Sequence, residues 1–461
     1  MKELTCFEVV KAVNGVQLSG PKDAVFKNIS TDTRKIKKGE LFIPLIGENF
    51  DGHEFIEKAF EKGAAGVLTQ KMIQPDNDRV IIRVEDTKKA LGSIAAYYRS
   101  KFSPYVVAIT GSVGKTSTKD IGASALAYSY NVLKTEANYN NEIGLPLTLL
   151  KLDDKVDIAV LEMGMRGQGE IRYLTNIVKP NAAIITNIGL AHIERLGSQE
   201  NILKAKLEIT EGLQEGGTVI LNGDDPLLYG MKGKLNSRIV YFGINNDDVE
   251  YKAININNLG LEGIEFDIII NDEKYKVKVP SPGIHNVYNA LAAFAVGMEI
   301  GQSPDKIIKG ILNYKPTQMR LDVKEYKGIT IINDAYNANP QSMEAAIKVL
   351  KDISKKGRAI AVLGDMLEMG EYASKAHFDI GSFAFKQGID YVVTVGEKGK
   401  LIAKGAVREG MENERVYSFD DNEEAGMFLR NFAREGDCIL VKGSRGMKME
   451  EVIEVLTYGE L

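Results

Sequence analysis

The chain has 461 residues, 44% of them hydrophobic and 26% charged, with a formal net charge of −5 at pH 7. Such a length exceeds what one hydrophobic core organises, so we expect about two to four domains. The negative balance, without a block of clustered Lys and Arg, argues against a nucleic-acid-binding surface. Cys6 and Cys438 are too few and too isolated for a disulfide framework, which predicts two buried thiols.

Residues 1–104 have the pattern of a small α/β domain. We expect helices near 8–13 and over 54–62, and strands over 41–45 and 66–68. The start of the chain lacks the succession of basic, apolar and cleavage-site residues of a secretory leader, and no apolar run reaches membrane-spanning length. These observations predict a cytoplasmic protein without membrane insertion.

A polar turn within this domain contains Ser30, Thr31, Asp32, Thr33 and Arg34. Hydroxyl groups beside a guanidinium suit the edge of a nucleotide or a phosphate group. A turn capped by the aspartate, without any ligand, explains the same residues equally well. The local sequence leaves both interpretations open.

A β-branched run at 106–110 leads into a loop that contains Gly111 and Gly114, and then into a helix predicted over 118–130. Backbone without a Cβ atom can close around phosphate oxygens, and the positive end of the helix dipole faces the same anion. Lys115 adds a positive charge, and the hydroxyl of the next residue is suited to bind magnesium. The predicted phosphate-binding residues are Gly111, Ser112, Val113, Gly114, Lys115, Thr116 and Ser117.

This loop is shorter than the full P-loop pattern, because Ile109 stands where that pattern has its first glycine. A tight turn between strand and helix, with a solvated lysine, is the alternative interpretation. The agreement of strand, loop and helix signals favours a phosphate-binding loop.

The central region, 105–316, alternates strands and helices, which favours a mostly parallel sheet covered on both faces. Strands are expected at 157–161, 182–186 and 218–221. Polar residues stand where ligands bind in such sheets, at or beyond strand ends: Asn140, Asn141, Glu162 and His192. Taken singly, the glutamate and the histidine are ordinary structural residues, but beside a phosphate loop they favour a magnesium site.

A helix predicted over 199–213 places Lys206 in the middle of an apolar stripe. A lysine there is costly unless its charge is suppressed or paired. Burial lowers a lysine pKa, and a neutral amine can react with carbon dioxide to form an anionic carbamate. The alternative is a lysine whose stem packs while its head reaches water, and the pattern alone favours this alternative.

Further along, residues 248–280 have the pattern of a small antiparallel excursion, and an alanine-rich helix follows from about residue 285. Asn286 or Asn289 could bond an adenine edge, although the first could instead cap the helix. Residues 317–461 restart the alternation, with strands at 329–332, 359–363, 391–395 and 438–441. No Gly-x-Gly-x-x-Gly follows the first of these strands, so dinucleotide binding is not implied.

At this point the chain resembles the Mur ligases, the ATP-dependent amide-forming enzymes that build the peptidoglycan stem peptide. The segment 110–116 resembles their phosphate loop, Glu162 and His192 match their magnesium ligands, and Lys206 matches a lysine that many members carry as a carbamate. The likeness covers the whole chain. It implies an α/β fold of three domains: a UDP-substrate domain at 1–104, a central P-loop parallel-sheet domain at 105–316 and a Rossmann-like domain at 317–461.

Within the family, segment 334–340 is similar to the signature of the member that adds D-alanyl-D-alanine to the UDP-linked tripeptide. The turn at 30–34, together with 51–53, resembles the uridine-nucleotide domain of that member. Two departures concern fine substrate contacts: Thr33 replaces a common serine, and Asn333 replaces a common acid. The resemblance implies an ADP-forming ligase of peptidoglycan precursor synthesis, and hence of cell wall biogenesis, cell shape and cell division.

The resemblance also implies four sets of site residues, with ATP and Mg²⁺ as cofactors. The catalytic set is Lys115, His192, Lys206 and Arg320. The ATP-binding set adds Asn286, Asn289, Arg320, Asp334 and Asn337 to the phosphate loop. The UDP-substrate set is Ser30, Thr31, Asp32, Thr33, Arg34, Asn140 and Asn141. The metal set is Thr116, Glu162, His192 and Lys206 as its carbamate.

The expected partners are small molecules, namely UDP-N-acetylmuramoyl-tripeptide and D-alanyl-D-alanine, and the expected state is a monomer. The nearest rival interpretations are another Mur ligase or a folylpolyglutamate-synthase-like amide ligase. From a different class, the chain could be a non-catalytic ATP-binding switch. A switch has no need to bring Glu162, His192 and Lys206 together, so that set favours an enzyme.

Overall fold

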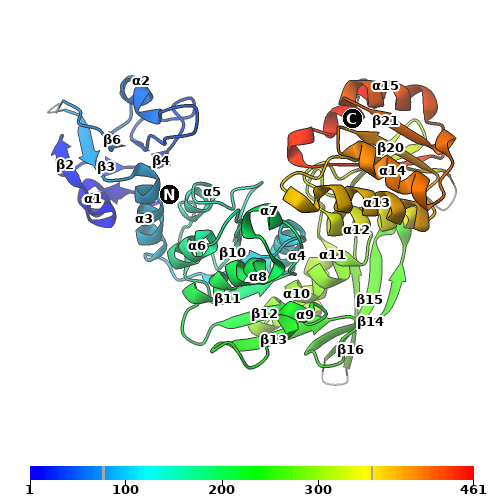
Figure 1. The fold of residues 1–461 in the computed structure, drawn as a ribbon. Coiled ribbons are helices and arrows are strands. Elements are labelled where there is room, and N and C mark those ends of the chain that lie inside the picture. The colour runs from blue at the N-terminus through cyan, green and yellow to red at the C-terminus, as the bar shows by residue number, and fades with distance from the viewer. Residues whose placement is uncertain (75–77, 271–272, 355–356, 461) are drawn as a thin grey trace.

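Three bodies of secondary structure follow one another along the chain in the computed structural model (Figure 1). The structure describes residues 1–74, 78–270, 273–354 and 357–460. Within these residues the strands form four sheets, of two, five, nine and six strands. The fold is α/β and agrees with the predicted three-domain architecture, while the exact boundaries after residues 104 and 316 stay predictions.

The amino-terminal body pairs four of its strands in parallel and closes the sheet with one antiparallel strand. The strand predicted at 41–45 is shorter than expected, since Pro44 has no N–H for a ladder bond. The elements are β1 (Leu4–Thr5), α1 (Cys6–Val13), β2 (Val16–Ser19), β3 (Val25–Phe26), β4 (Ile29–Ser30), β5 (Leu41–Phe42), η1 (Gly52–Phe55), α2 (Ile56–Glu61), β6 (Gly66–Thr69), β7 (Val80–Arg83) and α3 (Thr87–Arg99).

The central sheet has nine strands. These are β8 (Tyr105–Thr110), β9 (Val132–Lys134), β10 (Ile158–Glu162), β11 (Ala182–Ile185), β12 (Thr218–Asn222), β13 (Arg238–Gly243), β14 (Tyr251–Asn258), β15 (Ile264–Ile270) and β16 (Glu273–Val279). Strands β14 to β16 are antiparallel to one another, which confirms the predicted excursion. Strand β8 lies between β10 and β11, where the chain order of the parallel strands reverses. Open α/β sheets bind ligands at such a switch point.

Helices cover both faces of this sheet. Along β8, Val106 and Ala108 belong to one buried cluster, and Val107 and Ile109 belong to another on the opposite face. The helices are α4 (Lys115–Ala127), α5 (Gly144–Leu149), α6 (Glu170–Val178), α7 (Ile193–Leu196), α8 (Gln199–Leu207), η2 (Glu208–Gly212), α9 (Pro226–Tyr229), η3 (Gly260–Glu262), α10 (His285–Glu299) and α11 (Pro304–Leu312).

Two predicted helix boundaries in this body are wrong. Helix α4 begins at Lys115 rather than at 118, because Gly114 takes a left-handed conformation (φ +83°) and the chain turns directly into the helix. The helix predicted over 199–213 is α8 followed by the 3-10 helix η2. There the Glu208 carboxylate accepts hydrogen bonds from the N–H groups of Gly169 and Arg172, at the start of α6.

The carboxyl-terminal sheet runs in the order β17, β18, β22, β19, β20, β21, and only the pair β17–β18 is antiparallel. Four of its strands confirm the predicted ones, whereas β17 and β21 were not predicted. The elements are β17 (Asp322–Tyr326), β18 (Ile329–Asn333), α12 (Pro340–Ile353), β19 (Ala359–Gly364), η4 (Gly370–Tyr372), α13 (Ala373–Lys386), β20 (Tyr391–Val395), α14 (Gly399–Glu409), η5 (Asn413–Arg415), β21 (Val416–Phe419), α15 (Asn422–Phe432), β22 (Cys438–Lys442), η6 (Arg445–Met447) and α16 (Glu450–Thr457).

Both cysteines are buried and free, as predicted. Among the described residues, no helix combines the length and the apolar character that crossing a membrane requires.

Helix α3 joins the first body to the second by packing against α5 and α6. Gly92 of α3 faces Tyr173 of α6 so closely that a Cβ atom on the glycine would lie 2.0 Å from the tyrosine hydroxyl oxygen. That hydroxyl is buried and has no hydrogen-bond partner among the described residues. The contact therefore depends on the shape of the two residues rather than on a polar bond.

We expect Gly92→Ala to destabilise the protein by about 1–3 kcal/mol, because an added methyl group overpacks this interface. Tyr173→Phe should not lower the melting temperature, since it removes an unpaired hydroxyl. The double variant should recover part of the loss. Thermal unfolding followed by circular dichroism measures all three, and an unchanged melting temperature for Gly92→Ala would contradict the contact.

Candidate active site

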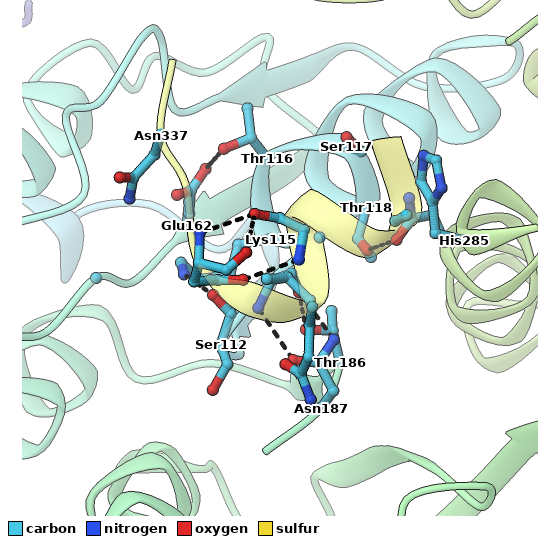
Figure 2. A pocket seen from close by; sticks show the side chains of 18 of the residues that line it. Ser112, Lys115, Thr116, Ser117, Thr118, Glu162, Thr186, Asn187, His285 and Asn337 are labelled. Carbon is cyan, nitrogen blue, oxygen red and sulfur yellow. Dashed lines mark hydrogen bonds between the residues drawn. The ribbon is translucent and has the colours of Figure 1, made fainter. Parts of the chain in front are cut away.

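A cleft of about 1140 Å³ opens between the central and carboxyl-terminal bodies. The loop after β8, the tips of β10 and β11, and the start of α10 line one wall, and residues 334–346 line the other. Figure 2 shows side chains of this cleft, with the loop after β8 and Asn337 in one view. Segments more than two hundred residues apart thus face one another, as the resemblance implied for the ATP-binding set.

The loop after β8 is built for close backbone approach. Gly111 has φ +151°, and a Cβ atom there would lie 1.8 Å from the Thr186 hydroxyl oxygen. The loop is braced from the tip of β11, because Val113 N–H donates to Asn187 Oδ1 (3.0 Å) and the Thr186 hydroxyl donates to the Val113 carbonyl (2.6 Å). Helix α4 starts without a side-chain cap, so its first N–H groups are free to bind an anion.

Lys115 folds back over this loop, where its ammonium donates to the carbonyl oxygens of Gly111 (2.8 Å) and Ser112 (3.4 Å). Burial lowers the pKa of Lys115, Glu162 opposes that shift, and the positive charge of Arg320 adds to it. An anion in the cleft would reverse the effect of burial, so the lysine is suited to bind phosphate rather than to lie in apolar surroundings.

The corner beside this lysine has the donors of a magnesium site. Glu162, at the end of β10, is 2% exposed. One of its oxygens accepts from the Thr116 hydroxyl (2.9 Å), and the other accepts from the Asn140 side-chain amide (2.8 Å). A hydroxyl and a carboxylate at the edge of a phosphate-binding loop fit Mg²⁺, which takes one or two protein oxygens and fills its other positions with water and phosphate.

His192 lies on the same wall, in a left-handed conformation (φ 64°) just before α7. Its Nδ1 atom lies 2.8 Å from Glu368 Oε2 of the carboxyl-terminal body. Burial lowers the pKa of His192, the charge of Lys115 lowers it further, and Glu368 opposes the shift. Among the residues that the structure describes, no group of three or more His, Cys, Asp or Glu side chains is arranged to hold a metal ion.

A second contact between the two walls lies nearby. A Cβ atom on Gly189 would lie 1.8 Å from the side-chain oxygen of Gln341, so a larger residue there would displace the glutamine side chain. Gln341 belongs to α12, which follows the 334–340 segment. The two walls therefore meet through backbone as well as through the His192–Glu368 pair.

Lys206 is 1% exposed, so the interpretation that its head reaches water, which the pattern alone favoured, is wrong. Its ammonium makes no hydrogen bond or ion pair with any residue that the structure describes. Burial lowers its pKa well below the usual value, and the charge of Lys115 contributes. Its ammonium group is therefore readily neutralised, which is the state that carbamate formation needs.

The adenine candidates lie at the start of α10. The Asn286 amide donates to the Pro282 carbonyl (2.9 Å), and the Asn289 amide donates to Asn286 Oδ1 (3.1 Å). Asn286 lies inside α10 and does not cap it, because the residue before the helix is Ile284. The cap interpretation is wrong because the helix starts one residue before this asparagine.

The sequence reasoning missed His285, which also lines the cleft. Its Nδ1 atom is buried without a hydrogen-bond partner among the described residues, and burial lowers its pKa to about 4. A neutral histidine with one free ring nitrogen can bond a ligand. The sequence signal that could have identified His285 is its position directly before the asparagine pair, at the first turn of a buried helix.

On the opposite wall, the Arg320 guanidinium lies 4.0 Å from the centre of the Tyr336 ring. Asp334 pairs with Lys442, with 2.5 Å between Oδ2 and Nζ. The Asn337 side-chain oxygen accepts from the N–H of Ala338 (2.9 Å). All of these residues line the cleft, so the predicted ATP-binding residues come together from both walls.

The predicted UDP-substrate residues separate into two places. Asn140 and Asn141 line the cleft, whereas the turn at 30–34 lies in the amino-terminal body and does not line it. In that turn Asp32 accepts from the Arg34 N–H (2.9 Å), and the Arg34 side chain lowers the pKa of Asp32 to about 2. The geometry is that of an aspartate-capped polar turn, and a nucleotide role for it stays a prediction.

Comparison with known proteins gives matches along most of the chain. Residues 25–99 match the family model described as "Mur ligase family, catalytic domain". Residues 109–297 match the model described as "Mur ligase middle domain". Residues 319–445 match the model described as "Mur ligase, glutamate ligase domain". A relative from Bacillus subtilis (strain 168), named UDP-N-acetylmuramoyl-tripeptide--D-alanyl-D-alanine ligase, is 41% identical over 100% of both chains.

Two solved structures are similar over nearly the whole chain. One, described as MurF from Acinetobacter baumannii, has a TM-score of 0.91 and 32% identity, and covers 99% of each chain. The other, described as MurF ligase from Thermotoga maritima in complex with ADP, has a TM-score of 0.83 and 28% identity, and covers 94% of this chain and 97% of that one.

The buried lysine predicts a pH-dependent stability. Because the folded state lowers the pKa of Lys206, the unfolded chain binds more protons than the folded one below about pH 10, and this difference opposes folding there. We expect Lys206→Met to raise the melting temperature at pH 7 in carbonate-free buffer, and the gain to shrink as pH approaches about 10.

Lys204→Met is the matched control, since this neighbouring lysine of α8 is exposed. It should leave the melting temperature almost unchanged at every pH. A gain for Lys206→Met that stays constant across the pH range would show that burial does not suppress the charge of this lysine.

Proposed function

This chain belongs to the Mur ligase family, and from that membership and the geometry of the cleft we propose that it is an ATP-dependent, ADP-forming ligase. In this proposal it joins D-alanyl-D-alanine to UDP-N-acetylmuramoyl-tripeptide in peptidoglycan precursor synthesis. The observation that carries the proposal is the cleft itself, which brings the loop after β8 opposite the 334–340 segment. The full-length similarity to a ligase of that name supports it.

A carboxylate and an amine do not condense in water, so the carboxylate first needs a leaving group. The γ-phosphoryl group of ATP passes to the tripeptide carboxylate and gives an acyl phosphate and ADP. The dipeptide amine then attacks the acyl carbon and expels phosphate as the amide bond forms. Repulsion among anions is the main barrier to the first step, so the protein must supply positive charge.

The phosphate side of the cleft would supply that charge. Lys115 and the N–H groups at the start of α4, which has no side-chain cap, would bind the β and γ phosphates. Thr116 and Glu162 would hold Mg²⁺, which neutralises phosphate charge when bound. Arg320 and Asp334 would contact the nucleotide from the opposite wall, while His285, Asn286 and Asn289 lie where they could bind the adenine.

We further propose that Lys206 reacts with carbon dioxide and acts as a carbamate. The proposal rests on its burial, its lowered pKa and the absence of a hydrogen-bonding partner among the described residues. A carbamate would place a negative charge near Lys115 and His192, whose pKa values already respond to nearby positive charge. It would then orient the metal ligands instead of repelling Lys115.

The other substrates follow from the arrangement of the three bodies. We propose that residues 1–104, with Ser30, Thr31, Asp32, Thr33 and Arg34, bind the UDP moiety, and that Asn140 and Asn141 meet the substrate where it enters the cleft. Residues 105–316 would form the ATP domain, and residues 317–461 would close over it. A monomer in the cytoplasm, where ATP and nucleotide-linked precursors are available, is the state that we propose.

A sister ligase remains the main rival, and the 334–340 segment together with full-length similarity to the relatives weighs against it. A non-catalytic switch does not need a buried lysine beside the phosphate loop, because desolvation of the lysine lowers the stability of the protein and signalling gains nothing from it. We therefore propose the ligase.

Phosphate release from ATP tests the proposal. We expect release only when both UDP-N-acetylmuramoyl-tripeptide and D-alanyl-D-alanine are present, together with formation of a pentapeptide product. Lysine-type and diaminopimelate-type tripeptides should be compared, and the faster of the two identifies the preferred third residue. Lys115→Ala should lower turnover by about 100-fold or more, because it removes a charge that stabilises the transferring phosphate.

The exposed Lys234→Ala variant is the control and should keep full activity. Wild-type protein that releases phosphate without dependence on either substrate would leave the fold intact but overturn the proposed pair of substrates.

The carbamate has its own test. Lys206→Ala should lose most activity, and a short carboxylic acid such as acetate should restore part of it by placing a carboxylate in the vacated space. Sodium chloride at equal ionic strength should not restore it. Lys204→Ala, on the same helix, should be fully active without acetate, and wild-type activity in Lys206→Ala would exclude the carbamate.

A further inference from the structure

Lys442 is a buried lysine that no step above uses. It stands at the end of β22, and its side chain is 3% exposed. Its ammonium meets Asp334 Oδ2 at 2.5 Å, the Asn337 carbonyl oxygen at 2.9 Å and the Asp334 carbonyl oxygen at 3.5 Å. An ammonium has three N–H donors, and protein oxygens occupy all three. Lys442 is therefore placed to act through its neighbours rather than on a ligand.

Asp334 also forms a hydrogen bond with the start of the carboxyl-terminal body. Its second carboxylate oxygen, Oδ1, accepts from the N–H of Leu321 at 3.2 Å. Its own N–H donates to the carbonyl of Val441, next to Lys442, at 2.9 Å. One carboxylate thus connects the end of β22 with the chain segment that enters this body from the central one.

That segment has a strained backbone. Met319 (φ 57°) and Leu321 (φ 49°) both lie in the left-handed region, which non-glycine residues rarely adopt. They flank Arg320, whose guanidinium stacks on Tyr336. Such a conformation persists only where surrounding contacts hold it, and it clusters at functional sites. Here the holding contacts are the Leu321–Asp334 bond and a bond from Tyr336 N–H to the Met319 carbonyl (3.3 Å).

We propose that Lys442 is a positioning residue for Arg320. Its ion pair fixes the Asp334 carboxylate, the carboxylate fixes Leu321, and the strained turn then presents Arg320 to the phosphate loop across the cleft. The importance of this relay for catalysis rests on the proposed ligase function, in which Arg320 contacts the nucleotide. Arg320 and Lys115 both line the cleft, and the charge of Arg320 contributes to the lowered pKa of Lys115.

Without its partner, Asp334 would be a carboxylate of low exposure, 14%, in a cleft that must accept a triphosphate. This carboxylate would no longer be held in place for the Leu321 N–H, and the turn that presents Arg320 would be lost. Loss of the turn predicts weaker nucleotide binding and slower turnover.

Lys442→Met tests the relay, with Lys404→Met on the exposed face of α14 as the matched control. We expect kcat to fall roughly 10- to 100-fold, since a displacement of about 1 Å in a positioning group has an effect of that order. Calorimetry should show weaker binding of ADP with magnesium. KM for D-alanyl-D-alanine should change much less than kcat. The weaker ADP binding is the result that general loss of folded protein would not produce, because an unfolded fraction lowers the number of binding sites and not their affinity.

A double variant with Arg320→Ala separates this relay from a merely structural role. If Lys442 acts through Arg320, Lys442→Met should lower kcat and ADP affinity no further once Arg320 is alanine. Losses that multiply, or a Lys442→Met enzyme equal to its control, would overturn the proposal. Should Lys442→Met not fold, Lys442→Gln, which keeps two N–H donors but no charge, takes its place.

The two proposals fail in different ways. If phosphate release by the wild-type protein does not depend on both substrates, the ligase assignment is overturned. ADP binding by the two single variants and the double variant would still decide the relay. An active wild type with independent effects at Lys442 and Arg320 would overturn the relay alone.

Discussion

Positive charge held in a desolvated cleft is the condition on which the rest of this structure depends. Lys115 and Lys206 are both placed where burial lowers their pKa values, and Lys115 adds to the shift at Lys206. Such an arrangement disfavours the charged form of both lysines, because it removes their amines from water and brings the charge of Lys115 close to Lys206. Anions that bind in the cleft would favour the charged form of Lys115 again, so phosphate and carboxylate groups would offset part of this cost.

The fold builds this cleft from parts of the chain that are far apart in sequence. The loop after β8, Glu162 at the end of β10 and the 334–340 segment meet at one cleft because parallel strands end at a common edge. The two walls touch through His192 and Glu368 and through the approach of Gln341 to Gly189. Both contacts join the central body to the carboxyl-terminal one, so catalysis and the relative position of these bodies are linked.

Sequence patterns predicted the parts with regular repeats. The buried strands, the phosphate loop and the antiparallel excursion follow from periodicity and glycine placement, and the structure contains them. The burial of the Lys206 side chain could not be predicted, because the same apolar stripe is compatible with a snorkelling lysine and with a buried one. Only three-dimensional packing distinguishes the two. The Lys442–Asp334 pair joins residues 108 positions apart, and no local pattern encodes such a pairing. The edge strands β17 and β21 were missed because short edge strands carry a weak alternation.

Strand β8 lies at the middle of the parallel strands, with neighbours on both edges and apolar clusters on both faces. Amide protons in such a strand exchange with solvent only when the whole domain opens, so the phosphate loop at its end has a fixed anchor. The opposite wall follows β18 and continues into α12, and Met343 and Ala346 of that helix belong to the core of the carboxyl-terminal body. A movement of the carboxyl-terminal body relative to the central one would therefore carry Arg320 and Asp334 with it, while the loop after β8 keeps its position.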